Sequence, residues 1–293
     1  MVEKKKISVK TIQKFKNDGQ KITALTAYDY STAKYLDESG VDIVLIGDSL
    51  AMVALGYETT HAIGMEEMLI FTKAVARGAT RAMVAVDMPF MSYHTDIATA
   101  IKNAGEMIRA GAKAVKIEGG GDYILQVIER CVQSGIPVIG HLGFTPQFLN
   151  TIGGYNIQGK SFANTLEILE QAKKLEKAGV FAIVLEMVPE ESAKYITDNL
   201  NIPTIGIGAG RYCSGQILVS DDIFGKFSDF TPKFARKYAD LSLLIQNSAK
   251  QYIEEVKNGK FPNTEEVFNL SEEELRQLKI HTEKHSTNDV GLC

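Results

Sequence analysis

Six short apolar runs in this chain each end in an acidic residue or a histidine, and this pattern constrains the fold more than any other feature. The runs are 43–48, 83–87, 114–118, 137–141, 182–186 and, less regularly, 24–29. A parallel α/β sheet builds its site in this way, because its strands are buried and their carboxyl ends meet at one edge. We therefore expect parallel strands whose last side chains converge.

Eight segments have the composition of strands, and helical patterns fill most of the gaps between them. The strand segments are 22–28, 42–48, 83–89, 114–119, 137–143, 182–188, 203–209 and 217–221. Apolar residues at helical spacing occur at 65–78, 94–111, 122–135 and 164–179, each closing on a glycine. This alternation predicts a (β/α)8 TIM barrel, with an open doubly wound sheet as the alternative.

The ends of the chain and two long loops complete the predicted organisation. Residues 8–18 have the spacing of a helix capped by Ser8, and 240–256 is a further amphipathic helix. We expect residues 1–262 to form a single catalytic domain. Residues 263–293 would be a polar extension, with a short helix to about Ile280 and disorder from 281. The loops 49–64 and 144–163 are long enough to be functional, the second as a lid, an oligomer contact or a surface insertion.

Composition excludes several classes of protein. The chain has 32 basic and 36 acidic residues, a net charge of −4, so we expect no nucleic-acid partner. It lacks an apolar run of about 18 residues and an apolar signal core, so we expect no membrane span and a cytoplasmic location. Cys131, Cys213 and Cys293 are odd in number and widely spaced, which argues against a disulfide framework or a zinc site.

Three carboxylates at the ends of neighbouring strands point to a metal. Asp48, Asp87 and Glu118 would repel one another if their strands lie side by side. A divalent cation removes this repulsion, and a site made of oxygen ligands suits Mg²⁺ better than Zn²⁺. The alternative is that each acid is solvated or pairs with a lysine.

Lys116, His141 and Glu186 add further chemistry to the same strand ends. Lys116 shares a strand face with Glu118, so its ammonium would bind either a substrate carboxylate or a neighbouring acid such as Asp87. Glu186 follows four apolar residues, and a carboxyl in a partly dry site is suited to acid–base work. The glycines of 206–210 do not match the dinucleotide-binding GxGxxG spacing.

The chain resembles the 3-methyl-2-oxobutanoate hydroxymethyltransferase family, also called the ketopantoate hydroxymethyltransferase family. The resemblance rests on ordered motifs between about residues 8 and 262: TAYDYSTAK (26–34), LIGDSL (45–50), VDMPFMSY (86–93), VKIEGG (115–120), PVIGHLGFTPQ (137–147), GGYNIQGK (153–160), LEMVP (185–189), IPTIGIGAG (202–210) and GQILV (215–219). It implies transfer of a hydroxymethyl group from 5,10-methylenetetrahydrofolate to 3-methyl-2-oxobutanoate, giving 2-dehydropantoate in pantothenate biosynthesis. It also implies a barrel of the phosphoenolpyruvate/pyruvate type, one Mg²⁺ per subunit and a homo-oligomer, expected to be a decamer.

The resemblance also assigns roles to the strand-end residues. It implies that Asp48 and Asp87 bind the metal, and through it the substrate, with Glu118 acting through water. The remaining roles are substrate contacts for Ser49, Lys116 and His141, and the acid–base role for Glu186. The base would remove the C3 proton of the oxo acid, giving an enolate that Mg²⁺ stabilises.

The sequence departs from the family pattern in two places, and two other functions stay open as alternatives. This chain reads Ser214-Gly215-Gln216 where the family usually has Asp-Gly-Gln, for which we expect a loop or folate-side effect. It also continues beyond the family's usual end. A carbon–carbon lyase or phosphomutase of the same barrel group is an alternative that a catalytic loop cysteine would favour. A non-enzymatic oligomeric scaffold is the other alternative.

Overall fold

A closed barrel of eight parallel strands forms the first part of the molecule. The computed structural model describes residues 5–227, 230 and 232–286, and the chain divides into two compact units, Met1–Asp240 and Leu241–Cys293. The first unit closes its strands in the order β1 to β8, which confirms the barrel over the doubly wound sheet. The strands are β1 (Ile22–Thr26), β2 (Ile43–Ile46), β3 (Met83–Asp87), β4 (Ala114–Glu118), β5 (Val138–Gly143), β6 (Ala182–Glu186), β7 (Thr204–Ile207) and β8 (Gly215–Leu218).

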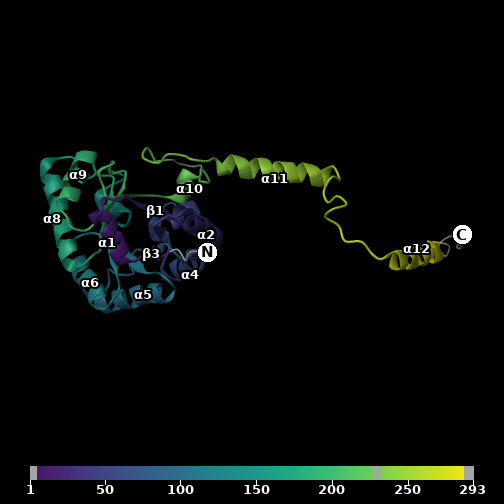
Figure 1. Ribbon diagram of the computed structural model, residues 1–293, viewed down its shortest axis with the longest axis horizontal. Coiled ribbons are helices and arrows are strands. Elements are labelled where there is room, and N and C mark those ends of the chain that lie inside the picture. The colour runs from purple at the N-terminus through teal and green to yellow at the C-terminus, as the bar shows by residue number, and fades with distance from the viewer. Residues whose placement is uncertain (1–4, 228–229, 231, 287–293) are drawn as a thin grey trace. The chain divides into compact units, whose positions relative to one another are not determined.

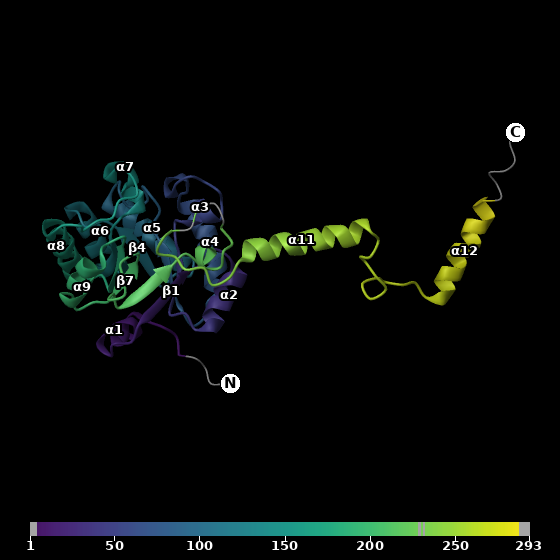
Figure 2. The ribbon, with the colours of Figure 1, turned by 90° about the horizontal axis from the view of Figure 1, so that it is seen from above.

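Helices surround the strands and cover the two ends of the barrel. They are α1 (Val9–Asn17), α2 (Tyr30–Ser39), α3 (Leu50–Val53), α4 (Met65–Gly78), α5 (Ile97–Arg109), α6 (Asp122–Gln133), α7 (Leu149–Ile152), α8 (Phe162–Ala178), α9 (Glu190–Asp198) and α10 (Ser220–Ile223). Helices α4, α5, α6, α8 and α9 lie around the outside of the strands (Figure 1). Figure 2 shows α1 at one end of the barrel and α3 and α7 at the other. Residues 208–214, between β7 and β8, form no helix.

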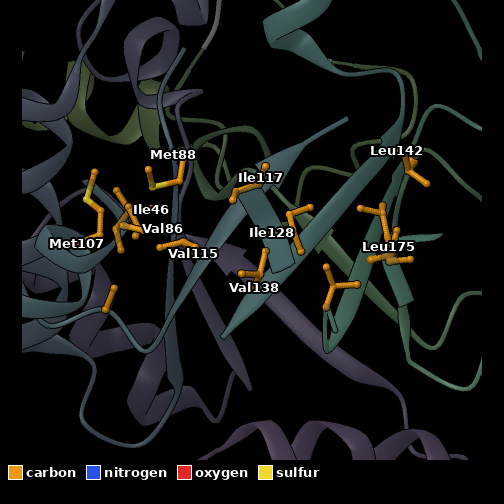
Figure 3. Packing of buried hydrophobic residues seen from close by; sticks show 14 of the residues in the cluster. Ile46, Val86, Met88, Met107, Val115, Ile117, Ile128, Val138, Leu142 and Leu175 are labelled. Atoms are coloured by element: carbon orange, nitrogen blue, oxygen red, sulfur yellow. The ribbon is translucent and has the colours of Figure 1, made fainter. Parts of the chain in front are cut away.

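Alternation along the strands separates two layers of core. The inward positions Ile43, Met83 and Ala85 pack inside the barrel with Ile12 of α1, which closes the end opposite α3 and α7. The outward positions pack against the surrounding helices, as Figure 3 shows for Val138 of β5 beside Ile128 of α6. Because successive side chains of a strand point to opposite faces, the next inward position after Ala85 is Asp87.

Local signals in the sequence set the helix boundaries. The Ser8 hydroxyl accepts a hydrogen bond from the Thr11 amide, which confirms the predicted cap of α1. Asp29 and Asp96 cap α2 and α5 in the same way. Gly179 ends α8 with a φ of 97°, a left-handed conformation that a residue with a Cβ adopts at a cost. The predicted sequence of helix, glycine and strand is therefore present.

The second unit contains two helices, α11 (Leu241–Lys257) and α12 (Glu272–Ser286). Helix α12 continues beyond the predicted end near Ile280, so the expected disorder from residue 281 is wrong for 281–286, and 287–293 lie outside the described residues. The first unit ends at Asp240, before the domain boundary at residue 262, which stays a prediction. No helix in the described ranges is long and apolar enough to cross a membrane.

The two long loops carry short helical turns. Residues 49–64 contain α3 and the 3₁₀ helix η1 (Thr60–Ala62), and residues 144–163 contain α7 and the 3₁₀ helix η2 (Pro146–Phe148). They meet where His61 Nε2 lies 2.9 Å from the carbonyl oxygen of Gln147. Both loops follow the carboxyl ends of their strands, so they cover that end of the barrel.

Candidate active site

Five of the predicted residues occupy inward positions at the carboxyl ends of adjacent strands. Asp87 ends β3, Lys116 and Glu118 lie on β4, His141 on β5, and Glu186 ends β6. The parallel register sets Asp87 beside Lys116 and Glu118 beside His141. The same alternation that fills the barrel with apolar residues thus ends in a layer of ionisable side chains.

Contacts join the first of these residues into a continuous chain. The Asp48 amide, just after β2, donates a hydrogen bond to Asp87 Oδ2 over 3.0 Å. Lys116 Nζ lies 2.9 Å from Asp87 Oδ1 and 3.2 Å from Glu118 Oε1. All four side chains are buried, so these interactions are poorly screened by solvent.

His141 continues the chain to Glu186. Its Nδ1 lies 3.1 Å from Glu118 Oε1 and its Nε2 lies 3.3 Å from Glu186 Oε2, the second contact without hydrogen-bonding angles. Acidic and basic side chains therefore alternate along Asp87, Lys116, Glu118, His141 and Glu186, and we call this row of five side chains the charged chain. With Asp48 hydrogen-bonded to Asp87, the fold brings together every strand-end residue predicted for β2 to β6.

The surroundings shift the pKa of four of these groups. Burial and the charges of Asp87 and Glu118 raise the pKa of Asp48 well above its usual range. Burial opposes charge on Glu118, but Lys116 and His141 lower its pKa to about 2. Burial and Lys116 act against a charge on His141, but Glu118 and Glu186 raise its pKa to about 9. Despite burial, the three acids around Lys116 raise the pKa of its ammonium. Glu118 is therefore an anion and His141 a cation at neutral pH.

Sequence reasoning missed Gln147, which connects the site to the loop after β5. Its side-chain Nε2 donates to Asp48 Oδ2 over 2.8 Å and to the carbonyl oxygen of Met88 over 2.9 Å. The Tyr93 hydroxyl donates to Gln147 Oε1 over 2.8 Å, and the Gln147 amide donates to Glu118 Oε2 over 3.1 Å. No strand pattern marks this position; its place in the motif GFTPQ was the only available signal.

Ser49 lies at the edge of the charged chain. It precedes α3, and its Oγ is 2.9 Å from the hydroxyl oxygen of Tyr28. A Cβ at Gly47 would come within 2.8 Å of Ser49 Oγ and 3.7 Å of Asp87 Oδ2. Glycine at position 47 therefore leaves room for the serine hydroxyl close to Asp87.

The backbone around Glu186 is held on both sides. The Phe144 amide donates to the Glu186 carbonyl oxygen over 2.8 Å, and the Met187 amide donates to that of Ile207 over 2.9 Å. A Cβ at Gly143 would lie 2.3 Å from the same Glu186 carbonyl oxygen, so this approach requires glycine. Met187 has a φ of 50°, an unfavourable conformation for a residue with a side chain. This strain is located directly after the carboxylate expected to act as the base.

Asp48 and Asp87 have the character expected of ligands for a divalent cation. Asp87 Oδ1 is buried and lies 2.9 Å from the Lys116 ammonium without hydrogen-bonding angles. Burial and neighbouring acids disfavour the ionised form of Asp48, which a bound cation would stabilise. Both oxygens of Glu118 already contact Lys116, His141 or Gln147. Among the described residues, no three Asp, Glu, His or Cys side chains are grouped to hold a metal. A Mg²⁺ ion here would therefore complete its shell with water or substrate oxygens.

Ser214 lies at the end of the barrel opposite these residues. It precedes β8, its amide donates to Thr204 Oγ1 over 3.3 Å, and its own Oγ accepts from the Thr204 amide over 3.3 Å. Thr204 begins β7, so both lie at the amino ends of their strands. The expected loop or folate-side effect of Ser214 stays a prediction; Ser214 lies in the loop before β8, across the barrel from the carboxyl-end loops.

The described cysteines lie in positions that do not suit a catalytic nucleophile. Cys131 lies in α6 and Cys213 precedes β8, and both side chains are buried. Burial raises the pKa of Cys131 to about 11 and raises that of Cys213. Neither thiol supports the lyase alternative, which would need a reactive cysteine in a loop.

Sequence comparison finds many close relatives. The profile of the ketopantoate hydroxymethyltransferase family matches residues 6–264. The 3-methyl-2-oxobutanoate hydroxymethyltransferase of Caldicellulosiruptor bescii is 52% identical over 263 residues, covering 90% of this chain and 99% of the relative. That of Syntrophus aciditrophicus is 53% identical over 265 residues, covering 90% and 97%.

Structural comparison finds the same barrel in more distant proteins. Phosphonopyruvate hydrolase, solved with oxalate and Mg²⁺, superposes with a TM-score of 0.57 at 11% identity, covering 98% of this chain and 100% of that one. 2,3-Dimethylmalate lyase, a member of the PEP mutase/isocitrate lyase superfamily, gives 0.56 at 14% identity, covering 96% and 97%. At such identities the likeness establishes the fold, which confirms the predicted barrel type.

Proposed function

Since this chain belongs to the ketopantoate hydroxymethyltransferase family, we propose that it transfers a hydroxymethyl group to 3-methyl-2-oxobutanoate, giving 2-dehydropantoate for pantothenate synthesis. The one-carbon donor in this proposal is 5,10-methylenetetrahydrofolate. One observation supports the assignment most strongly: the charged chain from Asp87 to Glu186 spans four adjacent strand ends and finishes on a carboxylate that contacts an imidazolium.

Glu186 is the proposed base for the C3 proton of the oxo acid. Its side chain retains 16% of its exposed surface, whereas His141 retains 2%, so Glu186 is the member of the pair that a substrate can approach. His141 Nε2 lies 3.3 Å from Glu186 Oε2, so a cation stands beside the carboxylate proposed to accept the proton. Once Glu186 is protonated, the His141 charge is available to the negative charge that develops on the substrate.

Asp48 and Asp87 are the proposed ligands of one Mg²⁺ per subunit, with Glu118 acting through water. When bound, the metal would supply Lewis-acid stabilisation for charge that develops on the keto oxygen. Lys116 holds Asp87 by an ion pair, and Gln147 holds Asp48 by a hydrogen bond, so both carboxylates are oriented in advance. Ser49, Lys116 and His141 are the proposed donors to the substrate carboxylate or enolate oxygen.

The proposed reaction balances with one water molecule. The oxo acid loses its C3 hydrogen to Glu186, and its C3 carbon forms a bond to the methylene carbon of the donor. Both carbon–nitrogen bonds of the donor break, water supplies the hydroxyl group of the product, and the two nitrogens of tetrahydrofolate take up one hydrogen from C3 and one from water.

We also propose that the chain acts in the cytoplasm as a homo-oligomer, with a decamer as the expected size. Light scattering coupled to gel filtration tests the size directly. A monomer at micromolar concentration would contradict the oligomer.

The proposed function is tested by incubating the protein with 3-methyl-2-oxobutanoate, methylenetetrahydrofolate and Mg²⁺, and detecting 2-dehydropantoate by mass. We expect product that disappears with EDTA and returns with Mg²⁺. Protein-dependent exchange of the C3 hydrogen for deuterium is expected without the donor. Absence of both from folded protein would favour the scaffold alternative, and cleavage of a 2-oxo acid without donor would favour the lyase.

A further inference from the structure

A cavity of about 470 Å³ lies between helix α8 and the segments that follow the carboxyl ends of β4 and β5. Three consecutive glycines (119–121) form one wall, and Phe148 forms another. The face of α8 that carries Glu167 and Gln171 also lines the cavity. A volume of this size falls within the range of small-molecule sites.

Backbone hydrogen bonds connect the cavity walls to the active-site residues. Gly119 directly follows Glu118, and its amide donates to the carbonyl oxygen of His141 over 3.0 Å. The Gln158 amide, on the far wall, donates to the carbonyl oxygen of Met187 over 2.9 Å. Met187 is the residue after Glu186. A ligand in the cavity would therefore lie against the same backbone that positions the charged chain.

The α8 wall offers polar groups that the protein does not use. Asn164, Glu167, Ile168 and Gln171 follow the i, i+3, i+4, i+7 spacing that places residues on one helix face. Within the described residues, the Glu167 carboxylate and the Gln171 amide form no hydrogen bond or ion pair that would occupy them. The cavity thus combines an aromatic ring, apolar side chains, a free carboxylate and a free amide.

We propose that this cavity binds the pterin ring of the one-carbon donor, an inference that rests on the proposed function. The 2-amino-4-oxo edge of a pterin presents two adjacent N–H donors, and a carboxylate such as Glu167 accepts both. The flat ring stacks on an aromatic side chain such as Phe148. The same carboxylate repels the glutamate tail of a folate, so the ring rather than the tail belongs here.

The glycine wall supplies one position where a side chain can be added at the cavity lining without strain. A Cβ at Gly120 would lie 3.0 Å from Gln171 Cβ, and Gly119 has a φ of 99°, so substitutions at either would disturb the wall. Gly121 has a φ of −70°, and a Cβ there meets nothing within 4 Å. Gly121→Leu therefore places a side chain in open space beside the cavity, with the backbone unchanged.

The test uses Gly121→Leu and Glu167→Gln, each with a matched control. Gly105→Leu lies on α5, where a Cβ approaches only Arg109, at 3.7 Å, and Glu170→Gln lies on α8 outside the cavity lining. Both test variants are expected to raise the KM for methylenetetrahydrofolate about 10-fold or more, the scale of losing a hydrogen bond to a charged group or a filled pocket. The KM for 3-methyl-2-oxobutanoate and C3 deuterium exchange should stay within about two-fold of wild type, as should the controls.

Binding of tetrahydrofolate, measured by equilibrium dialysis, separates this inference from the proposed function. Product from wild type with unchanged donor KM in both variants overturns the cavity assignment and leaves the reaction standing. If folded wild type makes no product, the proposed function fails, and dialysis still decides the cavity. Tetrahydrofolate binding that is lost in Gly121→Leu supports it; binding that is equal or absent overturns it. If Gly121→Leu does not fold, Glu167→Gln gives the answer.

Discussion

Gln147 Nε2 donates a hydrogen bond to Asp48 Oδ2 over 2.8 Å, across 99 positions of sequence. The same side chain accepts from Tyr93 and donates to the carbonyl oxygen of Met88. One amide from the loop after β5 therefore connects the carboxylate after β2 with the segment after β3. Because buried networks of this kind lose more than one hydrogen bond when a member is removed, Gln147 is a sensitive point of the site.

We expect Gln147→Met to destabilise the protein by about 2–3 kcal/mol, because it keeps the volume and removes the hydrogen bonds of Gln147 to the buried Asp48 carboxylate, Met88 carbonyl and Tyr93 hydroxyl. It should also weaken Mg²⁺-dependent binding of the oxo acid, since Asp48 loses its orientation. Urea denaturation and calorimetric titration measure the two effects. The control is Gln126→Met on the exposed surface of α6, and equal behaviour of the two variants would refute the positioning role.

Glu186→Gln is expected to lower turnover about 100-fold or more, because an amide cannot take the C3 proton. Binding of 3-methyl-2-oxobutanoate should change little, since the variant keeps the shape and its position beside His141. Steady-state kinetics and deuterium exchange at C3 should fall together. Glu191→Gln, on the exposed part of α9, serves as the control. Turnover within a few-fold of wild type would remove Glu186 from the role of base.

Asp87→Asn is expected to weaken Mg²⁺-dependent binding of the oxo acid at least about 10-fold, as ligand loss does in metal sites. The change removes a negative charge while Asn retains an oxygen to accept from the Asp48 amide. Titration of the oxo acid with and without Mg²⁺ measures the effect without turnover. A dependence on Mg²⁺ equal to that of wild type would show that Asp87 is not a ligand.

Much of this site was predictable because the residues that carry it obey the alternation of a strand. Asp87, Lys116, Glu118 and His141 each extend a series of inward apolar positions, so their side chains had to converge once the barrel closed. The parallel register then fixed which of them touch. Neither step requires knowledge of distant loops.

The features that the sequence concealed depend on contacts between distant segments. Gln147 is placed by a loop, so no periodicity reports its contact with Asp48. The predicted eighth strand, 217–221, starts two residues late because Gly215 and Gln216 look like loop residues but pair with Ile22 and Thr23 of β1. The first residue of such a strand is set by pairing with the neighbouring strand, and the local sequence carries no information about that pairing.

Stability at low pH should depend on Asp37, far from the active site. Its carboxylate accepts hydrogen bonds from the amides of Thr80, Arg81 and Ala82, which lead into β3. Burial acts against the charge, but these bonds lower the pKa of Asp37 below its usual value. A depressed folded-state pKa gives stability that is present above the unfolded value of about 4 and lost as the pH falls through the folded value.

Asp37→Asn is therefore expected to cost about 1–3 kcal/mol at pH 7, because one amide oxygen replaces two charged acceptors. The difference from wild type should shrink as the pH falls below about 4, because the unfolded-state carboxyl is neutral there and the folded-state carboxyl becomes neutral at a still lower pH. Urea denaturation at pH 7 and pH 3 measures this, with Glu38→Gln as the exposed neighbour. A difference that is constant with pH would show that the Asp37 charge is not the cause.

Ser214→Asp introduces the residue that the family resemblance implies at this position, and we expect turnover within about two-fold of wild type. Ser214 exchanges hydrogen bonds with Thr204 at the amino end of β7, whereas the charged chain occupies the carboxyl ends of β3 to β6. A carboxylate would accept the Thr204 amide more strongly than a hydroxyl does, so the expected change is a gain in stability of about 1 kcal/mol. Thermal denaturation and steady-state kinetics on the same preparation measure both. A large rise in turnover with unchanged stability would instead mean that position 214 acts on the reaction across the length of the barrel.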